Sequence, residues 1–174
     1  KKKALHKLLP QSHGRRGRRR RVNRSSIPNR VSIHDRPKEI NSREEIGHWE
    51  ADLMSCQRGS QHLLVLVERK TLYGIVVRLE SKRAVDTIES LKKIMETLPE
   101  ELKKTITFDN GTEFTNHQEL LEELGIKTYF CDTYSSWQKG SVENMNGRLR
   151  RDFPRKLNVP LGDVKSLAFQ AKGR

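Results

Sequence analysis

Seven residues in the first half of the chain restrict the fold more than any other segment. The run HLLVLVE, from His62 to Glu68, is almost continuously apolar. A strand with one face in water alternates polar and apolar residues, whereas a strand that is covered on both faces is apolar throughout. We therefore expect a strand here that is buried on both faces, inside a sheet with other layers packed against each side.

Segments before and after this run predict further strands and helices. Two β-type segments, 49–56 and 72–79, flank it, with a turn at 57–60, so short connections make the three strands an antiparallel meander. Apolar spacing and turn residues then predict, in order, a helix over 84–98, a strand over 105–108, a helix over 116–124, a strand over 127–131 and a helix from residue 137 onward. This order of elements indicates an α/β domain.

Length and composition limit the class of protein. At 174 residues the chain is long enough for one domain with extensions. It holds no run of about 18 apolar residues, so no transmembrane helix and no membrane partner are expected. Cys56 and Cys131 are too few for a disulfide framework and have no metal-ligand spacing, which favours a reducing cytoplasm. His48, His62 and His117 lack the spacing of a zinc site, and we expect them to be structural.

Positive charge is concentrated at the N-terminus. The whole chain has a net charge of +13, and residues 1–46 hold 15 lysines and arginines against 4 acidic residues. The densest part has few apolar residues and cannot build a core. Its arginines are Arg15, Arg16, Arg18, Arg19, Arg20 and Arg21. This arm is either a solvated basic tail or a nucleic-acid-binding segment, and we favour the second because arginine pairs with phosphates through two parallel hydrogen bonds.

Three acidic residues lie in unusual local sequences. Asp52 stands within the first predicted strand, Asp109 directly follows a predicted strand, and Glu143 lies on the last predicted helix. Taken singly, each has an ordinary explanation: an edge aspartate, the first residue of an Asp-Asn-Gly turn and an exposed helix carboxylate. Taken together, they are the oxygen ligands that a pair of Mg²⁺ ions needs, with open positions left for a substrate phosphate.

The sequence motifs around these acids resemble those of a known family. They are GHWEAD (47–52), TFDNGTEF (107–114) and SSWQKGSVENMNGRLR (135–150), and the last two acids are 34 positions apart. In order and spacing they resemble the DDE signature of bacterial transposases of the insertion-sequence-thirty group, within the retroviral-integrase superfamily. The matching positions are Gly47, His48, Trp49, Glu50, Asp52, Asp109, Gly111, Glu113, Trp137, Gln138, Gly140, Glu143, Asn144, Asn146, Gly147 and Arg150.

This resemblance implies a fold and a reaction. The fold is ribonuclease H-like, with a five-stranded mixed sheet of order 3-2-1-4-5, flanked by helices and preceded by the basic, extended N-terminal arm. Asp52, Asp109 and Glu143 would be both catalytic residues and ligands of Mg²⁺, for which Mn²⁺ can substitute. The reaction would cut double-stranded DNA at the ends of an insertion element and transfer the cut strand into target DNA. The enzyme would act as a homodimer or higher oligomer, associated with the nucleoid in a bacterial cytoplasm.

Further residues of the third phrase are expected to act beside the acids. Those expected to orient Glu143 or contact the substrate are Trp137, Gln138, Asn144 and Asn146. The basic residues of this stretch are Lys139, Arg148, Arg150, Arg151, Arg155 and Lys156. They form either a solvated face or a set of phosphate-binding groups, and their position beside the acids favours DNA binding. Glu50 and Glu113 are expected to support the site rather than to bind metal.

We divide the chain into a basic DNA-binding arm (1–46), an integrase-like catalytic core (47–156) and a divergent or truncated C-terminal tail (157–174). The tail lacks the Asn-x-Arg-Pro-Arg phrase that the family carries after its core, and Ala51 replaces a glycine before the first acid. Two alternatives to a transposase stay open. One is a catalytically silent DNA-binding or assembly module, and the other is a ribonuclease H-type hydrolase, whose acids follow other spacings. The presence of all three acids favours the transposase.

Overall fold

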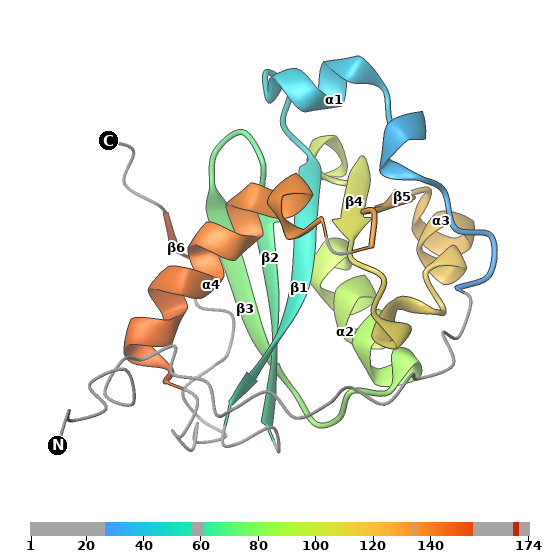
Figure 1. The fold of residues 1–174 in the computed structure, drawn as a ribbon. Coiled ribbons are helices and arrows are strands. Elements are labelled where there is room, and N and C mark those ends of the chain that lie inside the picture. The colour runs from blue at the N-terminus through green and yellow to red at the C-terminus, as the bar shows by residue number, and fades with distance from the viewer. Residues whose placement is uncertain (1–26, 57–60, 134, 155–168, 171–174) are drawn as a thin grey trace, which may run out of the picture.

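A mixed β-sheet with helices against both faces forms the middle of the molecule (Figure 1). The structure is a computed structural model and describes residues 27–56, 61–133, 135–154 and 169–170. The arginines of the predicted arm between residues 15 and 21, the predicted turn at 57–60, and Arg155 and Lys156 lie outside the described residues. No helix in the described part of the chain is long and apolar enough to cross a membrane.

The strand order confirms the predicted topology. The strands are β1 (His48–Cys56), β2 (Gln61–Glu68), β3 (Tyr73–Leu79), β4 (Thr105–Phe108), β5 (Lys127–Phe130) and β6 (Phe169–Gln170). β1, β2 and β3 form the antiparallel meander, and β4 and β5 continue the sheet from β1 in parallel, which gives the order 3-2-1-4-5. β6 adds a sixth strand on the outer edge of β3. It was not predicted, because a strand of two residues carries no periodic pattern.

The apolar run forms the interior strand that was expected. All eight residues of β2 are buried. Successive side chains of a strand point to opposite faces, and β2 follows this rule: Leu64 and Leu66 belong to one hydrophobic cluster, whereas Leu63, Val65 and Val67 belong to another. The sheet is therefore the middle of three layers, with a separate core on each side.

One face of the sheet is covered by α2 (Ala84–Glu96) and α3 (Gln118–Leu124). Both helices were predicted, but each predicted range was two residues too long. The excess lay at the C-terminal end of α2 and at the N-terminal end of α3. Gly125 ends α3 in the left-handed conformation, with a φ of +67°, which a residue without a Cβ atom adopts at little cost. The rings of Phe108 and Phe114 stack in this core, with centroids 4.3 Å apart.

The opposite face is covered by α4 (Gly140–Asp152), which follows the short 3₁₀ helix η6 (Ser136–Lys139). The apolar stripe of α4, formed by Val142, Met145 and Leu149, is buried against side chains of β1, β2 and β3. This layer places the residues of the third motif (135–150) against the sheet.

Residues 27–46 fold against the edge of the sheet, so the prediction of an extended N-terminal arm was wrong for this part. They contain a 3₁₀ helix, η2 (Ile33–Asp35), and α1 (Lys38–Ser42), both above the sheet in Figure 1. Ser32 forms a parallel bridge with Phe130 of β5, and Ile33 and Ile40 are buried. Isoleucines so far apart in a polar segment show no periodicity, and for this reason local sequence did not reveal their burial.

Candidate active site

The pairing of β1 with β4 brings Asp52 and Asp109 together. The two strands run parallel, and their register pairs Glu50 with Thr107. Two residues further along, the same register aligns Asp52 with Asp109, which directly follows β4. Asp52 points toward α4, because Met54, the next residue on the same face of β1, belongs to the core that packs on α4.

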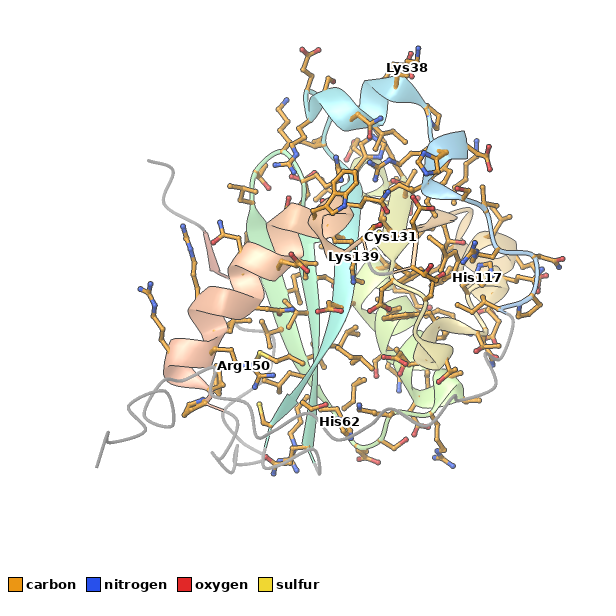
Figure 2. All side chains as sticks on the ribbon, in the orientation of Figure 1. Lys38, His62, His117, Cys131, Lys139 and Arg150 are labelled. Carbon is orange, nitrogen blue, oxygen red and sulfur yellow. The ribbon has the colours of Figure 1, made fainter. Side chains whose placement is uncertain are left out.

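Lys139, which is labelled in Figure 2, joins the two aspartates from the layer above the sheet. It is the last residue of η6, and only 3% of it is exposed. Its Nζ lies 3.0 Å from Asp52 Oδ1 and 3.7 Å from Asp109 Oδ2, and it donates to the Ala51 carbonyl at 3.0 Å. The sequence suggested an outward-facing lysine, because a basic residue among other basic residues gives no local sign of the side to which it points.

Negative charge exceeds positive charge in this cluster. Burial raises the pKa of Asp52; Lys139 opposes that shift, and the nearby charge of Asp109 adds to it. Burial also raises the pKa of Glu113, with further contributions from Asp109 and Asp52. Burial acts to lower the pKa of Lys139, yet Asp52 and Asp109 hold it above its usual value. The ammonium group of Lys139 thus faces two carboxylates, those of Asp52 and Asp109, and the electrostatics favour one more cation.

Asn146 supplies a further polar group from α4. Its Nδ2 donates to Asp52 Oδ2 at 2.6 Å. Its Oδ1 is buried and has no hydrogen-bond partner among the described residues. Amide oxygens are ligands of hard divalent cations, and a buried polar atom without a partner indicates that something else satisfies it. The donor set beside Asp52 therefore fits a cation such as Mg²⁺.

Glu143 lies one turn before Asn146 on α4 and is exposed, as is Asn144. Residues three apart share one side of a helix, so Glu143 lies on the side of α4 that also carries Asn146. No group of three or more Asp, Glu, His or Cys side chains in the described part of the chain is arranged to hold a metal ion. The structure therefore brings Asp52 and Asp109 together without Glu143, whose role as third ligand stays a prediction.

Glu50 holds the start of α4 against β1. It is fully buried, and its Oε2 accepts hydrogen bonds from the backbone N–H groups of Ser141, at 2.9 Å, and Val142, at 3.1 Å. Its Oε1 accepts from Arg69 Nη1 at 2.7 Å. The first N–H groups of a helix have no partner within the helix, and a carboxylate there is also favoured by the helix dipole. Glu50 thus sets where α4 begins. In the sequence, its position two residues before Asp52 indicated that it lies on the same face of the strand as that aspartate.

Gln138 closes the loop between β5 and α4. Its Oε1 accepts from the Asp132 backbone N–H at 2.8 Å, and its Nε2 donates to Asp132 Oδ2 at 2.9 Å. His34 Nε2 lies 2.7 Å from the same carboxylate oxygen. On the other side of the site, Arg30 contacts Asn110, which donates to the Cys131 carbonyl. The segment 27–36 therefore touches both loops that carry the site. Sequence reasoning missed these contacts because they join residues 80 and 98 positions apart.

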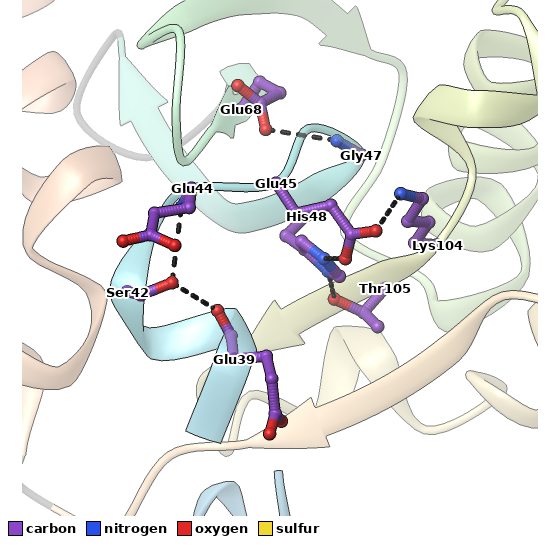
Figure 3. Close-up of polar contacts among 9 residues, drawn as sticks. All are labelled: Glu39, Ser42, Glu44, Glu45, Gly47, His48, Glu68, Lys104 and Thr105. Atoms are coloured by element: carbon purple, nitrogen blue, oxygen red, sulfur yellow. Dashed lines mark hydrogen bonds and ion pairs between the residues drawn. The ribbon is translucent and has the colours of Figure 1, made fainter. Parts of the chain in front are cut away.

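The histidines have structural partners. His48 bridges Thr105 Oγ1, at 2.8 Å from Nδ1, and Glu45 Oε2, at 3.0 Å from Nε2 (Figure 3). The neighbouring Trp49 donates from its indole nitrogen to the Leu102 carbonyl at 2.8 Å. These contacts fix the start of β1 against β4. His117 similarly joins Thr128 Oγ1 and the Pro28 carbonyl, and His62 Nδ1 lies 3.3 Å from Ser55 Oγ. The cysteines are buried and free, and burial raises the pKa of Cys131 to about 11.

The residues predicted to bind DNA divide into an exposed and a buried set. Arg148 and Arg151 are exposed on α4, and Trp137 is 75% exposed just before it. Arg150 is 9% exposed, with Nη1 3.5 Å from the Phe153 carbonyl and 3.8 Å from Cys56 Sγ. Arg148, Arg151 and Trp137 are thus accessible to a partner, whereas Arg150 points toward the end of its own helix.

Residues 42–136 match the family model described as Integrase core domain. The chain belongs to this family. The matched segment includes both aspartates of the site, and Glu143 and α4 lie beyond it.

Two relatives extend the similarity past the matched segment. Transposase InsI for insertion sequence element IS30A, from Escherichia coli K12, is 43% identical over 144 residues, which cover 83% of this chain and 37% of that protein. The transposase for insertion sequence element IS1086, from Cupriavidus metallidurans, is 38% identical over 176 residues, which cover 99% of this chain and 50% of that protein. This integrase core chain therefore spans no more than half the length of these relatives.

A solved structure agrees with the fold. The crystal structure of the catalytic core domain of BIV integrase superposes with a TM-score of 0.51 at 20% sequence identity, over 60% of this chain and 67% of that one. The similarity confirms the ribonuclease H-like architecture that the sequence resemblance implied.

Proposed function

We propose that this chain is the catalytic part of a DNA transposase, which cuts DNA at the ends of an insertion element and joins the cut strand to a target. The observation that carries the proposal is the convergence of Asp52 and Asp109, from adjacent parallel strands, on one position that attracts a cation. The similarity to proteins named as transposases supports the choice of DNA as substrate.

The residues that would hold Mg²⁺, or Mn²⁺ in its place, are Asp52 and Asp109, with Glu143 as the third ligand. The buried, unpartnered Oδ1 of Asn146 supports a cation beside Asp52. When bound, such an ion neutralises charge on a phosphate and lowers the pKa of an attacking water. In our proposal, the exposed side chain of Glu143 on the first turn of α4 completes the ligand set.

The chain's own residues prepare this site. Asn146 orients Asp52 through its Nδ2 hydrogen bond, and Glu50 holds the first turn of α4, from which Glu143 projects. Gln138 fixes the loop that leads into α4. The exposed Arg148 and Arg151 are suited to bind the DNA backbone, since side chains that contact phosphates position a protein on the duplex without reading its sequence.

The remaining features of the proposal concern organisation. Residues 1–46, with arginines from Arg15 to Arg21, would add sequence-independent affinity for double-stranded DNA. Residues 47–156 would form the catalytic core and 157–174 its tail. Trp137 and Asn144, both exposed, would contact the substrate. We propose a homodimer or higher oligomer on DNA, associated with the nucleoid of a bacterial cytoplasm, with element ends and target DNA as partners.

A nicking assay tests the function. Duplex DNA that carries the ends of the chain's own element is incubated with wild-type protein, Asp109→Asn or Glu122→Gln in Mg²⁺. Glu122 is exposed on α3, which covers the face of the sheet opposite α4, so its variant should cut like wild type. Asp109→Asn should bind DNA and cut at least about 1,000-fold more slowly, because each tenfold in rate is ~1.4 kcal/mol and a lost metal ligand removes several. DNA binding without any cutting by the wild type would favour the silent DNA-binding module instead.

A further inference from the structure

The surroundings of Lys139 Nζ resemble those of a metal ion more than those of a surface ammonium group. The atom is enclosed, and its neighbours are oxygens: a carboxylate oxygen of Asp52, the Ala51 carbonyl and, further away, a carboxylate oxygen of Asp109. Carboxylate and carbonyl oxygens are the ligands that Mg²⁺ takes in proteins. The side chain that carries this charge comes from another layer, 87 positions from Asp52 along the chain.

We propose that Lys139 is an internal substitute for the divalent cation: its ammonium group neutralises the aspartates while no ion is bound, and it withdraws when an ion enters. The inference rests on the proposed function, because it assumes that the two aspartates bind a divalent cation. It adds a specific competitor for that site, built into the chain.

Occupancy of the Asp52 oxygens supports competition. Oδ1 accepts from Lys139 and Oδ2 accepts from Asn146, so each carboxylate oxygen already has a donor. An incoming cation needs at least one of these oxygens, and it repels the ammonium group at short range. Asn146 carries no charge, whereas Lys139 does, so Lys139 is the donor that an ion displaces.

The position of Lys139 supports its withdrawal. It lies at the junction of η6 and α4, with a φ of −115° and ψ of 48°, outside the helical region. Gly140, the next residue, is exposed, and apart from its chain neighbours and the backbone of its own helix no heavy atom lies within 4 Å of the place of a Cβ. A lysine side chain has four flexible carbons and a compact charged end. Exposed surface therefore begins one residue after the buried Lys139, and in our proposal the flexible side chain reaches it while Glu50 holds the first turn of α4.

The experiment measures Mn²⁺ binding to the metal-free chain by titration calorimetry. Lys139→Met keeps an unbranched, flexible side chain, one heavy atom shorter, and removes its charge; Lys127→Met, at an exposed lysine of β5, is the matched control. We expect Lys139→Met to bind Mn²⁺ at least about tenfold more tightly than wild type, a difference of ~1.4 kcal/mol. In EDTA the same variant should melt below wild type, because Asp52 and Asp109 lose their counter-charge, and added Mn²⁺ should remove this difference in melting temperature. A lysine that only supports the fold would lower stability without raising affinity for Mn²⁺.

Lys139→Arg and a direct measurement cover the case in which Lys139→Met does not fold. Lys139→Arg retains the charge and should bind Mn²⁺ no more tightly than wild type. In wild-type protein with ¹³Cε-labelled lysines, saturating Mg²⁺ should move the Lys139 signal to the position and linewidth of exposed lysines and leave Lys127 unchanged. An unmoved Lys139 signal, or equal or weaker Mn²⁺ affinity in Lys139→Met, would overturn the proposal for Lys139. If the wild type still cuts DNA in that case, the proposed function stands; if neither protein binds Mn²⁺, the cation site itself fails.

Discussion

The two faces of the sheet are built from different kinds of contact. The face toward α2 is closed by aliphatic and aromatic side chains such as Leu64, Ile88 and Phe108. The face toward α4 also has an apolar strip, but at one end Glu50 and Asp52 point from β1 into polar partners. Apolar packing is non-directional and tolerates small shifts, whereas hydrogen bonds and ion pairs depend on geometry. The first face therefore holds the fold together, and the second sets the position of the groups that act.

The largest effect that tests this division is expected for Asp52→Asn. The variant loses a proposed metal ligand and should cut DNA about 1,000-fold more slowly, equivalent to ~4 kcal/mol in the barrier. Its melting temperature should stay within a few degrees of wild type, because the side chain keeps its shape, the apolar cores are untouched and Lys139 retains the Ala51 carbonyl and the Asp109 carboxylate. Nicking rates at saturating Mg²⁺ measure the effect, and a rate like that of wild type would remove the chemistry from the α4 face.

Glu50→Ala should give the next largest change, in stability. It leaves Arg69 buried without its carboxylate and removes the acceptor of two N–H groups of α4. Removing one partner of a buried ion pair destabilises proteins by about 3–5 kcal/mol, which urea unfolding can measure. Glu89→Ala, which breaks an exposed pair with Lys93, is the control and should change stability little. A loss below about 1 kcal/mol for Glu50→Ala would mean that α4 is held by its apolar stripe alone.

Two neighbouring leucines compare the faces directly. Leu63 and Leu64 are both fully buried in β2, but Leu63 packs in the α4 core and Leu64 in the α2 core. Each change to alanine should cost about 2–5 kcal/mol of stability. Cutting by the folded protein should slow only in Leu63→Ala, because only that cavity lies under α4. Equal cutting rates, measured well below both melting temperatures, would show that the position of α4 does not depend on its core.

The smallest effect is expected for Asn146→Ala. Groups that orient a metal ligand typically contribute 10–100-fold to metal affinity, and Asn146 orients Asp52 through one hydrogen bond. We expect a loss of about tenfold in Mn²⁺ affinity, measured by calorimetry. Asn144, two residues earlier and exposed, serves as the matched position: its change to alanine should leave the affinity unaltered. A similar loss in both variants would point to a general effect on α4 and not to the contact with Asp52.

The sequence predicted the fold well because the fold depends on repeated patterns. The apolar run of β2, the stripe of α4 and Gly125 after α3 each leave a local signal, and the structure agrees with all of them. The burial of Ile33 and Ile40 leaves no such signal, since two isolated apolar residues in a polar segment have no period.

The site was less accessible to prediction. The aspartates follow from the strand pattern and the family resemblance, but the inward direction of Lys139 depends on where η6 ends against β1, which is a tertiary contact. The exposed position of Glu143 likewise depends on how α4 is rotated, and the apolar stripe alone does not determine that rotation.

The hydrogen bond between His48 and Thr105 has a consequence for the whole motif GHWEAD (47–52). A shift of one residue between β1 and β4 would turn Asp52 away from α4 and bring Ala51 or Leu53 into its place, because strand faces alternate. β4 has only four residues, so backbone pairing alone defines its alignment weakly. The imidazole of His48 and the indole of Trp49 pin the start of β1, and Asp52 lies four residues later, about 13 Å along an extended strand. The motif GHWEAD thus sets a distance along β1. His48 is fixed to β4 at one end, and the four residues that follow place the Asp52 carboxylate beside Asp109, on the face of the sheet toward α4.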